Sequence, residues 1–434
     1  LTLCGMQLIM NRKKYILGGL VFALGFTLLV ASGHYQIVYY FAILALVVFL
    51  AWVVMQIMDK DYSSILRSAG VMAVGCVLGI LICSADLYSH YEVGKTSIRG
   101  RSELTAEVDG KEETKSSGLD RDYAFAWSYG IGETMTILVP NYVGGESGGT
   151  LDKRSSHLAK AYRSNNYQVP DRLQTYTYWG DQPFTSGPVY FGAIVCFLTL
   201  LALVYVRNKW TWIVFGASLF FFVLSFGHNM NINNTFFDVL PFYNKFRTPS
   251  MALIIPQMTF ALLGALALKK YVDSKSDDKF TLYLGVATTI TAGVCFLLWV
   301  APDMFGLTFK CDNDMSYGLP DWYMNALVKD RKDLLTSDAF RSMMFILVAA
   351  ALMWLCNMEK FVKFKKYAAL CVAVLTFLDL WNVDQRYLND SNFVRVKSSK
   401  NTIKPTDADK EIMSDKDLDY RVLTMNNPFN DTRV

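Results

Sequence analysis

The sequence lacks motifs from which soluble catalytic centres are commonly built. Its four histidines do not fall at HExxH spacing, so a zinc site made by the protein is not expected. The complete GxxxxGK[ST] phosphate loop is also absent, which argues against ATP hydrolysis by the P-loop route. Any transfer reaction therefore needs an activated donor supplied from outside the chain.

The sequence also lacks the excess of basic residues that nucleic-acid binding needs. Its 42 Lys and Arg against 38 Asp and Glu give a net charge of only +4. These basic residues are concentrated in short segments between apolar runs, which is a membrane pattern and no argument for nucleic acid.

Long apolar runs dominate the sequence instead. A hydrocarbon core about 30 Å thick needs roughly 20 mostly apolar residues per helix. The chain therefore predicts an all-α polytopic membrane protein with about nine transmembrane helices, at 15–32, 37–58, 69–85, 189–206, 210–226, 251–268, 280–300, 342–358 and 367–383.

Basic residues predict the orientation of these runs. If residues 12–14 lie in the cytoplasm, strict alternation places the basic residues of four further short segments there too, at 60–67, 207–209, 269–270 and 360–366. The same alternation exports the tail from 384 and three loops, at 86–188, 227–250 and 302–341. Only one of eight cysteines, Cys311, is then exported, so no disulfide is expected outside.

The expected domains are a transmembrane domain at 1–388, with the long loop 86–188 of mixed structure, and the beginning of an exported soluble domain at 389–434. The chain opens on Leu1 and its tail is too short for an independent core, so we expect both ends to continue. The missing parts would be the start of the transmembrane domain and most of the C-terminal domain. An apolar repeat around Tyr420 predicts the start of a strand.

Exported acids are candidates for acid–base chemistry. Asp86 and His90 lie four residues apart at the outer end of the third run, so they share one face if the helix continues; a hydrated helix end is the alternative. Asp122 is the preferred acid, ahead of Asp86, Glu133 and Asp379, because it lies beside Asp120 and Arg121 next to an aromatic segment. It could orient an acceptor hydroxyl or help to bind a divalent cation, and a local ion pair with Arg121 is the alternative.

Two pairs of exported cations are candidates for phosphate binding. Arg99 and Arg101 are separated by one glycine, and Lys245 and Arg247 lie between two prolines on the outer side. Arginine forks fit phosphate oxygens, so we expect both pairs to converge on one pocket that binds the phosphate of a lipid or substrate. The alternative is snorkelling side chains that anchor a helix end.

Aromatic residues near polar side chains are candidates for sugar binding. Trp127 and Trp179 could stack on sugar rings, and Asp181 or Gln182 could bond hydroxyl groups. The aromatic belt of any membrane protein is the alternative. Asp379 lies within the ninth run, where an acid usually has a partner or a role.

Five strings carry a resemblance to a known family: SIRGRSEL, GLDRDYAFAWSYGIGET, PNYVGGESGG, YWGDQPFTSGPVYFGA and FYNKFRTPSMALIIPQ. In this order and between these runs, the sequence resembles the bacterial membrane protein family YfhO over nearly all of its length. The resemblance implies a GT-C architecture in the bacterial cytoplasmic membrane, with a reaction centre in extracytoplasmic loops. The acidic residue that such enzymes carry in their first exported loop would precede Leu1, so no catalytic base is carried over.

The function that the resemblance implies is glycosyl transfer from a polyprenyl-phosphate sugar donor to a cell-envelope polymer or glycolipid. Two alternatives stay open: a transporter or flippase for lipid-linked polymers, and a non-catalytic accessory protein. A transporter should place charged or broken-helix sites near the bilayer midplane, whereas here the polar residues lie at the outer ends of the runs. That distribution favours the transferase.

Overall fold

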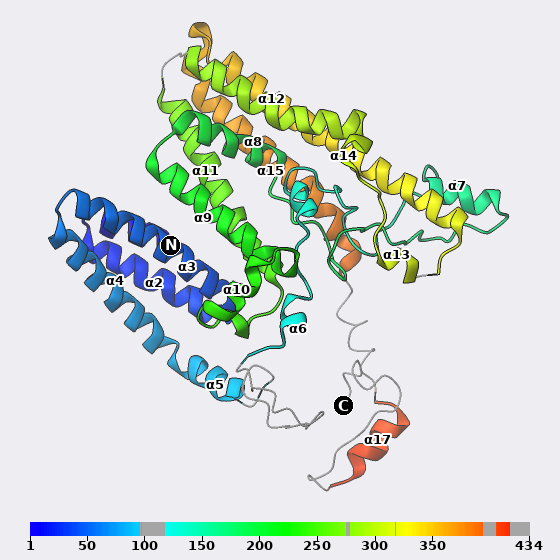
Figure 1. Ribbon diagram of the computed structural model, residues 1–434, viewed down its shortest axis with the longest axis horizontal. Helices are drawn as coiled ribbons and strands as arrows, with labels where there is room; N and C mark the ends of the chain where they lie inside the picture. The colour runs from blue at the N-terminus through cyan, green and yellow to red at the C-terminus, as the bar shows by residue number, and fades with distance from the viewer. Residues whose placement is uncertain (96, 98–117, 275–277, 317, 394–404, 417–434) are drawn as a thin grey trace. The chain divides into compact units, whose positions relative to one another are not determined.

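The chain folds into helices (Figure 1). The computed structural model describes residues 1–95, 97, 118–274, 278–316, 318–393 and 405–416, and within these residues the only β-structure is an isolated bridge between Thr150 and Gln174. The chain divides into two units, Leu1–Trp381 and Asn382–Val434. The described part of the second unit contains the end of α15, the turn η8 (Asp390–Asn392) and α17 (Asp407–Ser414).

The first helices form a bundle whose surface is apolar on almost every side, as expected of helices surrounded by lipid. A Cβ atom at Gly5 or Gly75 would overlap with Phe22, so these glycines let three of the helices approach closely. The members of this bundle are α1 (Thr2–Met10), α2 (Tyr15–Ala31), α3 (Tyr35–Met58) and α4 (Tyr62–Ile82).

Another set of helices surrounds a continuous buried core that includes Phe197, Leu263, Ala287 and Ile346. A π-helical turn, η2 (Ala202–Val206), extends the first of them. The set comprises α8 (Ala193–Leu201), α9 (Lys209–Ser225), α11 (Ile254–Asp273), α12 (Asp278–Val300), α14 (Asp321–Leu355) and α15 (Lys365–Tyr387).

Each of the nine predicted apolar runs lies largely in a helix of these two sets. Among the described residues, five helical segments are long and apolar enough to cross a membrane, which indicates a multi-pass membrane protein: Tyr35–Met58, Tyr62–Ile82, Pro249–Asp273, Lys279–Val300 and Asp321–Leu355. The helices Tyr15–Ala31, Ala193–Val206 and Lys209–Ser225 are apolar but shorter.

Helix α14 differs from the other long helices because its first half is polar. Its 35 residues extend for about 52 Å at 1.5 Å per residue, and α7 (His157–Ser164) packs along its polar half (Figure 1). The connecting segments contain short helices: α5 (Ser84–Lys95), α6 (Arg121–Phe125), η1 (Gly132–Ile137), η3 (Gly227–Asn229), α10 (Ile232–Val239), η4 (Tyr243–Lys245), η5 (Pro249–Leu253), η6 (Pro302–Phe305), α13 (Asn313–Ser316) and η7 (Glu359–Phe364).

Candidate functional site

A buried carboxyl group, that of Glu133 in η1, is the centre of the most connected polar cluster in the long loop. Its Oε1 atom accepts hydrogen bonds from the Tyr178 hydroxyl and from the backbone N–H of Asp181, each at 2.5 Å. Its Oε2 atom accepts one from Gln182 Nε2 at 3.1 Å. The Tyr129 hydroxyl donates to the Glu133 backbone carbonyl at 2.8 Å. These five residues form what we call the Glu133 cluster.

Two glycines allow this close packing. A Cβ atom at Gly180 would overlap with Glu133 Oε1 and with the Tyr178 hydroxyl, and one at Gly130 would overlap with Asp181 Oδ2. Any side chain at these positions would therefore displace the two carboxyl groups. Gly180 of the YWGDQ string and Gly130 of the SYGIGE string thus have a specific structural role.

Burial decides the electrostatics of Glu133, which is only 3% exposed. Desolvation raises the pKa of this carboxyl group above its usual value, and the nearby Asp181 carboxylate raises it further. The hydrogen bonds from Tyr178, Asp181 and Gln182 lower the pKa and offset this rise only in part. No cation pairs with Glu133 among the residues that the structure describes, so burial leaves the pKa of this carboxyl group raised.

Asp181 gives the cluster an exposed side. Its backbone is held by Glu133, whereas its carboxylate is exposed and packs against Gly130. The cluster therefore places a buried carboxyl group with a raised pKa next to an exposed one that a hydroxyl-bearing ligand can reach.

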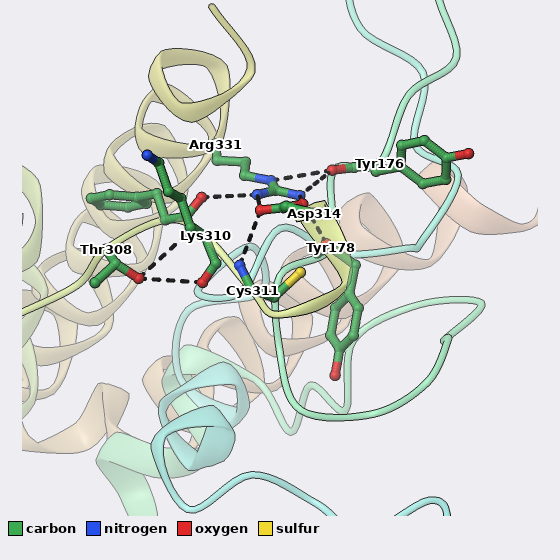
Figure 2. Close-up of polar contacts among 8 residues, drawn as sticks. Tyr176, Tyr178, Thr308, Lys310, Cys311, Asp314 and Arg331 are labelled. Carbon is green, nitrogen blue, oxygen red and sulfur yellow. Dashed lines mark hydrogen bonds and ion pairs between the residues drawn. The ribbon is translucent and has the colours of Figure 1, made fainter. Parts of the chain in front are cut away.

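An ion pair between Arg331 of α14 and Asp314 of α13 fixes the chain segment that carries Tyr178. Figure 2 shows the Arg331 guanidinium between Asp314 and the carbonyl oxygens of Tyr176 and Tyr178. Arg331 Nη1 lies 2.7 Å from Asp314 Oδ2, and Nη2 lies 2.9 Å from Oδ1, so the contact is bidentate. Nη2 also donates to Tyr176 O at 2.7 Å and to Tyr178 O at 3.3 Å. Burial raises the pKa of Asp314, but the Arg331 guanidinium and the backbone N–H of Cys311 together outweigh this effect, so the pKa lies below its usual value.

Further polar residues of α14 anchor other parts of the loop. Asp330 caps α7 by accepting hydrogen bonds from two of its N–H groups, at 2.7 and 2.8 Å. Asp338 accepts one from the backbone of Asn141 at 3.2 Å, and the Ser342 hydroxyl donates to the Leu138 carbonyl oxygen at 2.9 Å. The polar half of α14 thus acts as the support on which the loop is built.

Asp379, the acid within the ninth run, also has partners. It forms an ion pair with Arg341, accepts a hydrogen bond from the Tyr190 hydroxyl at 2.8 Å, and accepts another from the first N–H of α8. The side chain is completely buried. These contacts join α8, α14 and α15, which is a structural role.

The segment with Lys245 and Arg247 lies against the segment with Asp122. Arg247 Nη1 donates to the Tyr123 hydroxyl at 2.7 Å, and Thr248 N donates to the carbonyl oxygen of Ala124 at 3.0 Å. Burial lowers the pKa of Lys245. Arg247 is exposed, so this predicted phosphate-binding residue is accessible.

The backbone of this segment is held in an unusual conformation. Phe242 and Thr248 have φ angles of 64° and 61°, although neither is glycine, and a branched residue rarely adopts this region. Gln36 of α3 donates a hydrogen bond to the Arg247 carbonyl oxygen at 2.7 Å, which fixes the chain at this point. Strained residues that are held in this way are enriched at functional sites.

The predicted acids have different surroundings. Asp122 is exposed and makes no hydrogen bond or ion pair within the described chain, while the Asp120 side chain caps α6 and Arg121 pairs with Asp238 at 2.8 Å. Asp86 and His90 share α5, but the His90 ring bonds to the backbone carbonyl of Asp86 at 2.8 Å. Their roles, and a divalent cation at Asp122, stay predictions.

The predicted sugar-binding residues divide into two groups. Asp181 and Gln182 belong to the Glu133 cluster, and the Gln182 amide is committed to Glu133. Trp127 Nε1 donates to the Phe184 carbonyl oxygen at 3.2 Å, whereas the buried Nε1 of Trp179 has no partner within the described chain. Arg99 and Arg101 lie outside the described residues, so their convergence with Lys245 and Arg247 stays a prediction.

Two features were missed in the sequence. Arg331 and Asp314 are 17 positions apart in a region read only as an exported loop, and no local motif joins them. The residues at 145–149, GESGG, match the GxSxG pattern, but no strand precedes them and the Ser147 hydroxyl accepts a hydrogen bond from Thr185 N at 2.8 Å. This serine therefore lacks the strand–turn–helix context of a nucleophile.

Within the described chain, no group of three or more His, Cys, Asp or Glu residues could hold a metal ion. Comparison of the chain with protein-family models, with curated proteins and with solved structures finds no match. The geometry of the site is therefore what indicates the function.

Proposed function

We propose that the chain is a membrane glycosyltransferase of GT-C architecture that transfers a sugar from a polyprenyl-phosphate donor to a cell-envelope polymer or glycolipid. In this proposal all nine apolar runs cross the bacterial cytoplasmic membrane, and the Glu133 cluster faces the extracytoplasmic side. The observation that carries the proposal is the buried Glu133 carboxyl group, which has no cationic partner among the described residues and lies in a loop next to apolar helices.

Glycosyl transfer needs a proton acceptor and a site for the departing phosphate. A hydroxyl oxygen of the acceptor molecule bonds to the anomeric carbon of the sugar. The bond from that carbon to the phosphate oxygen breaks, and polyprenyl phosphate leaves. The hydroxyl proton passes to a carboxylate. Asp181 is exposed and can bond to the acceptor hydroxyl, while Glu133 holds its backbone. Lys245 and Arg247 would bind the phosphate through their cationic groups.

The alternative of a transporter requires polar groups that line a path through the spans. Asp379 and Arg341 form a largely buried charged pair between two apolar helices, in which they bond to each other and Asp379 also bonds to the first N–H of α8. This arrangement supports packing of the helices, so transfer is the function that the geometry favours.

The test is sugar transfer in proteoliposomes that contain the protein and a polyprenyl-phosphate-linked sugar. Asp181→Asn should lower turnover at unchanged protein level, and Arg247→Gln should mainly weaken donor binding. Asp59→Asn is the matched control, because Asp59 is an exposed acid at the opposite end of α3 from Gln36. Movement of the lipid-linked sugar between leaflets without any transfer would overturn the proposal in favour of a transporter.

A further inference from the structure

A group of aromatic rings lies at the polar end of α14. Tyr167 stacks on Trp322 with the ring centroids 5.6 Å apart and the planes at 15°, and Tyr162 of α7 meets Trp322 edge to face at 5.4 Å. We call these three residues the aromatic platform. Tyr167 is 58% exposed, so one face of its ring covers Trp322 while much of the residue is open to solvent.

The platform lies too far from the apolar part of α14 to be a membrane-interface belt. Trp322 precedes Arg341, the last charged residue before the apolar half, by 19 positions on one continuous helix. At 1.5 Å per residue this separation is about 28 Å, whereas the headgroup layer adds only about 5–8 Å on each side of the hydrocarbon. Exposed aromatic rings at that distance require another explanation.

The platform is rigidly supported from below. Leu158, Leu173 and Leu327 are almost completely buried beneath it, and the Tyr323 hydroxyl is 2.7 Å from the Thr175 hydroxyl. Asn166, with a φ of 57°, turns the chain so that Tyr167 returns to α7. A preorganised surface loses little entropy when a ligand binds to it.

The chain segment that carries Tyr162 and Tyr167 is basic. Residues 150–176 contain five basic residues against two acidic ones, Asp152 and Asp171: Lys153, Arg154, Lys160, Arg163 and Arg172. Lys153 pairs with Asp171 at 2.8 Å. The side chains of Arg154 and Lys160 are exposed and make no ion pair or hydrogen bond within the described chain. These cations are available to an anionic ligand.

We propose that the aromatic platform and the exposed basic side chains of residues 150–176 bind an anionic glycan. The C–H groups on one face of a sugar ring pack on the electron-rich face of an aromatic ring, and Tyr167 offers such a face. Carboxylate or phosphate groups along the chain then meet Arg154 and Lys160. This site is separate from the Glu133 cluster, and the proposal holds whether or not the chain transfers sugars.

Three probes separate stacking from charge, using the purified protein in nanodiscs. Oligogalacturonate carries sugar rings and carboxylates, its methyl ester keeps the rings without the charge, and polyphosphate carries charge without rings. We expect oligogalacturonate to bind more tightly than either of the other probes, with an affinity that falls as salt is added. Equal binding of polyphosphate and oligogalacturonate would overturn the proposal, because rings would then contribute nothing.

Variants locate the binding site. Tyr167→Ala should weaken oligogalacturonate binding by about three- to tenfold, which corresponds to one aromatic contact. Arg154→Gln combined with Lys160→Gln should weaken it by a similar factor and reduce its salt dependence. Tyr88→Ala is the control, since Tyr88 is 66% exposed on α5. If Tyr167→Ala binds as tightly as the Tyr88→Ala control, the platform is not the site.

Discussion

Two buried carboxyl groups in the loop region, those of Asp314 and Glu133, differ in the charge of their hydrogen-bond partners. Asp314 meets the guanidinium of Arg331 in a bidentate pair, and its pKa is lowered. Glu133 meets neutral donors only within the described chain, and its pKa is raised. Burial raises the pKa of both groups. Arg331 and the Cys311 N–H reverse this shift at Asp314, whereas the neighbouring Asp181 adds to it at Glu133.

This difference in pKa separates a structural role for Asp314 from a chemical role for Glu133. A carboxylate that is paired with a buried guanidinium is committed to that partner and keeps its charge at neutral pH, which suits an anchor. A buried acid without a cation has a pKa closer to neutral and can take up or release a proton, which suits a reaction. Arg331 bonds to the Tyr178 carbonyl oxygen and Tyr178 bonds to Glu133, so the anchor positions the reactive group.

The largest expected effect comes from breaking the ion pair between Arg331 and Asp314. Arg331→Met leaves Asp314 buried without its cation, so the local free energy of opening should fall by about 3–5 kcal/mol. Hydrogen–deuterium exchange of the amides at 175–182 measures this change. Lys332→Met is the control, because its ion pair with Asp303 is exposed and such pairs contribute about 0–1 kcal/mol. Equal exchange in the two variants would contradict the anchoring role.

The next effect is the dependence of stability on pH, which should have opposite signs at the two acids. The raised pKa of Glu133 contributes stability below its ordinary value of 4.5 that is lost as the pH rises through the folded-state pKa. The lowered pKa of Asp314 contributes stability above its ordinary value of 3.8 that is lost as the pH falls through the folded-state pKa. Glu133→Gln should abolish the loss of stability at rising pH and leave intact the loss of stability at falling pH that comes from Asp314. Hydrogen–deuterium exchange of the amides at 175–182 measures both losses.

The smallest effect should come from the exposed neighbour of Glu133. Asp181→Asn removes a negative charge that helps to raise the pKa of Glu133, so this pKa should fall. The same substitution at Asp122 should leave the Glu133 titration unchanged, because Asp122 does not contribute to that shift. A Glu133 pKa that is equal in the Asp181→Asn variant and the wild type would show that the two carboxyl groups do not interact.

The apolar runs were predictable because a membrane helix is a local property of the sequence. The run at 15–32 corresponds to α2 (Tyr15–Ala31), and the run at 37–58 lies within α3 (Tyr35–Met58). The run at 342–358 corresponds to only part of α14, since composition does not show that a polar segment continues the same helix. The strand expected around Tyr420 lies outside the described residues.

The site was harder to predict because its contacts are between distant residues. Glu133 was considered as a candidate acid but ranked behind Asp122, since crowding of charges in sequence was visible whereas burial was not. Gln182 was proposed for sugar binding, and the structure shows that its amide bonds to Glu133 across 49 positions. Asp379 was expected to have a partner, and Arg341, 38 positions away, is that partner.

The protonation of Glu133 itself tests the central claim most directly. Infrared difference spectra of the wild type minus Glu133→Gln, recorded as a function of pH, isolate the carboxyl stretch of this one side chain. We predict a protonated carboxyl band that persists above pH 4.5, the ordinary pKa of a glutamate, and that disappears at higher pH. A band that disappears at or below pH 4.5 would show an ordinary or lowered pKa and would contradict the account.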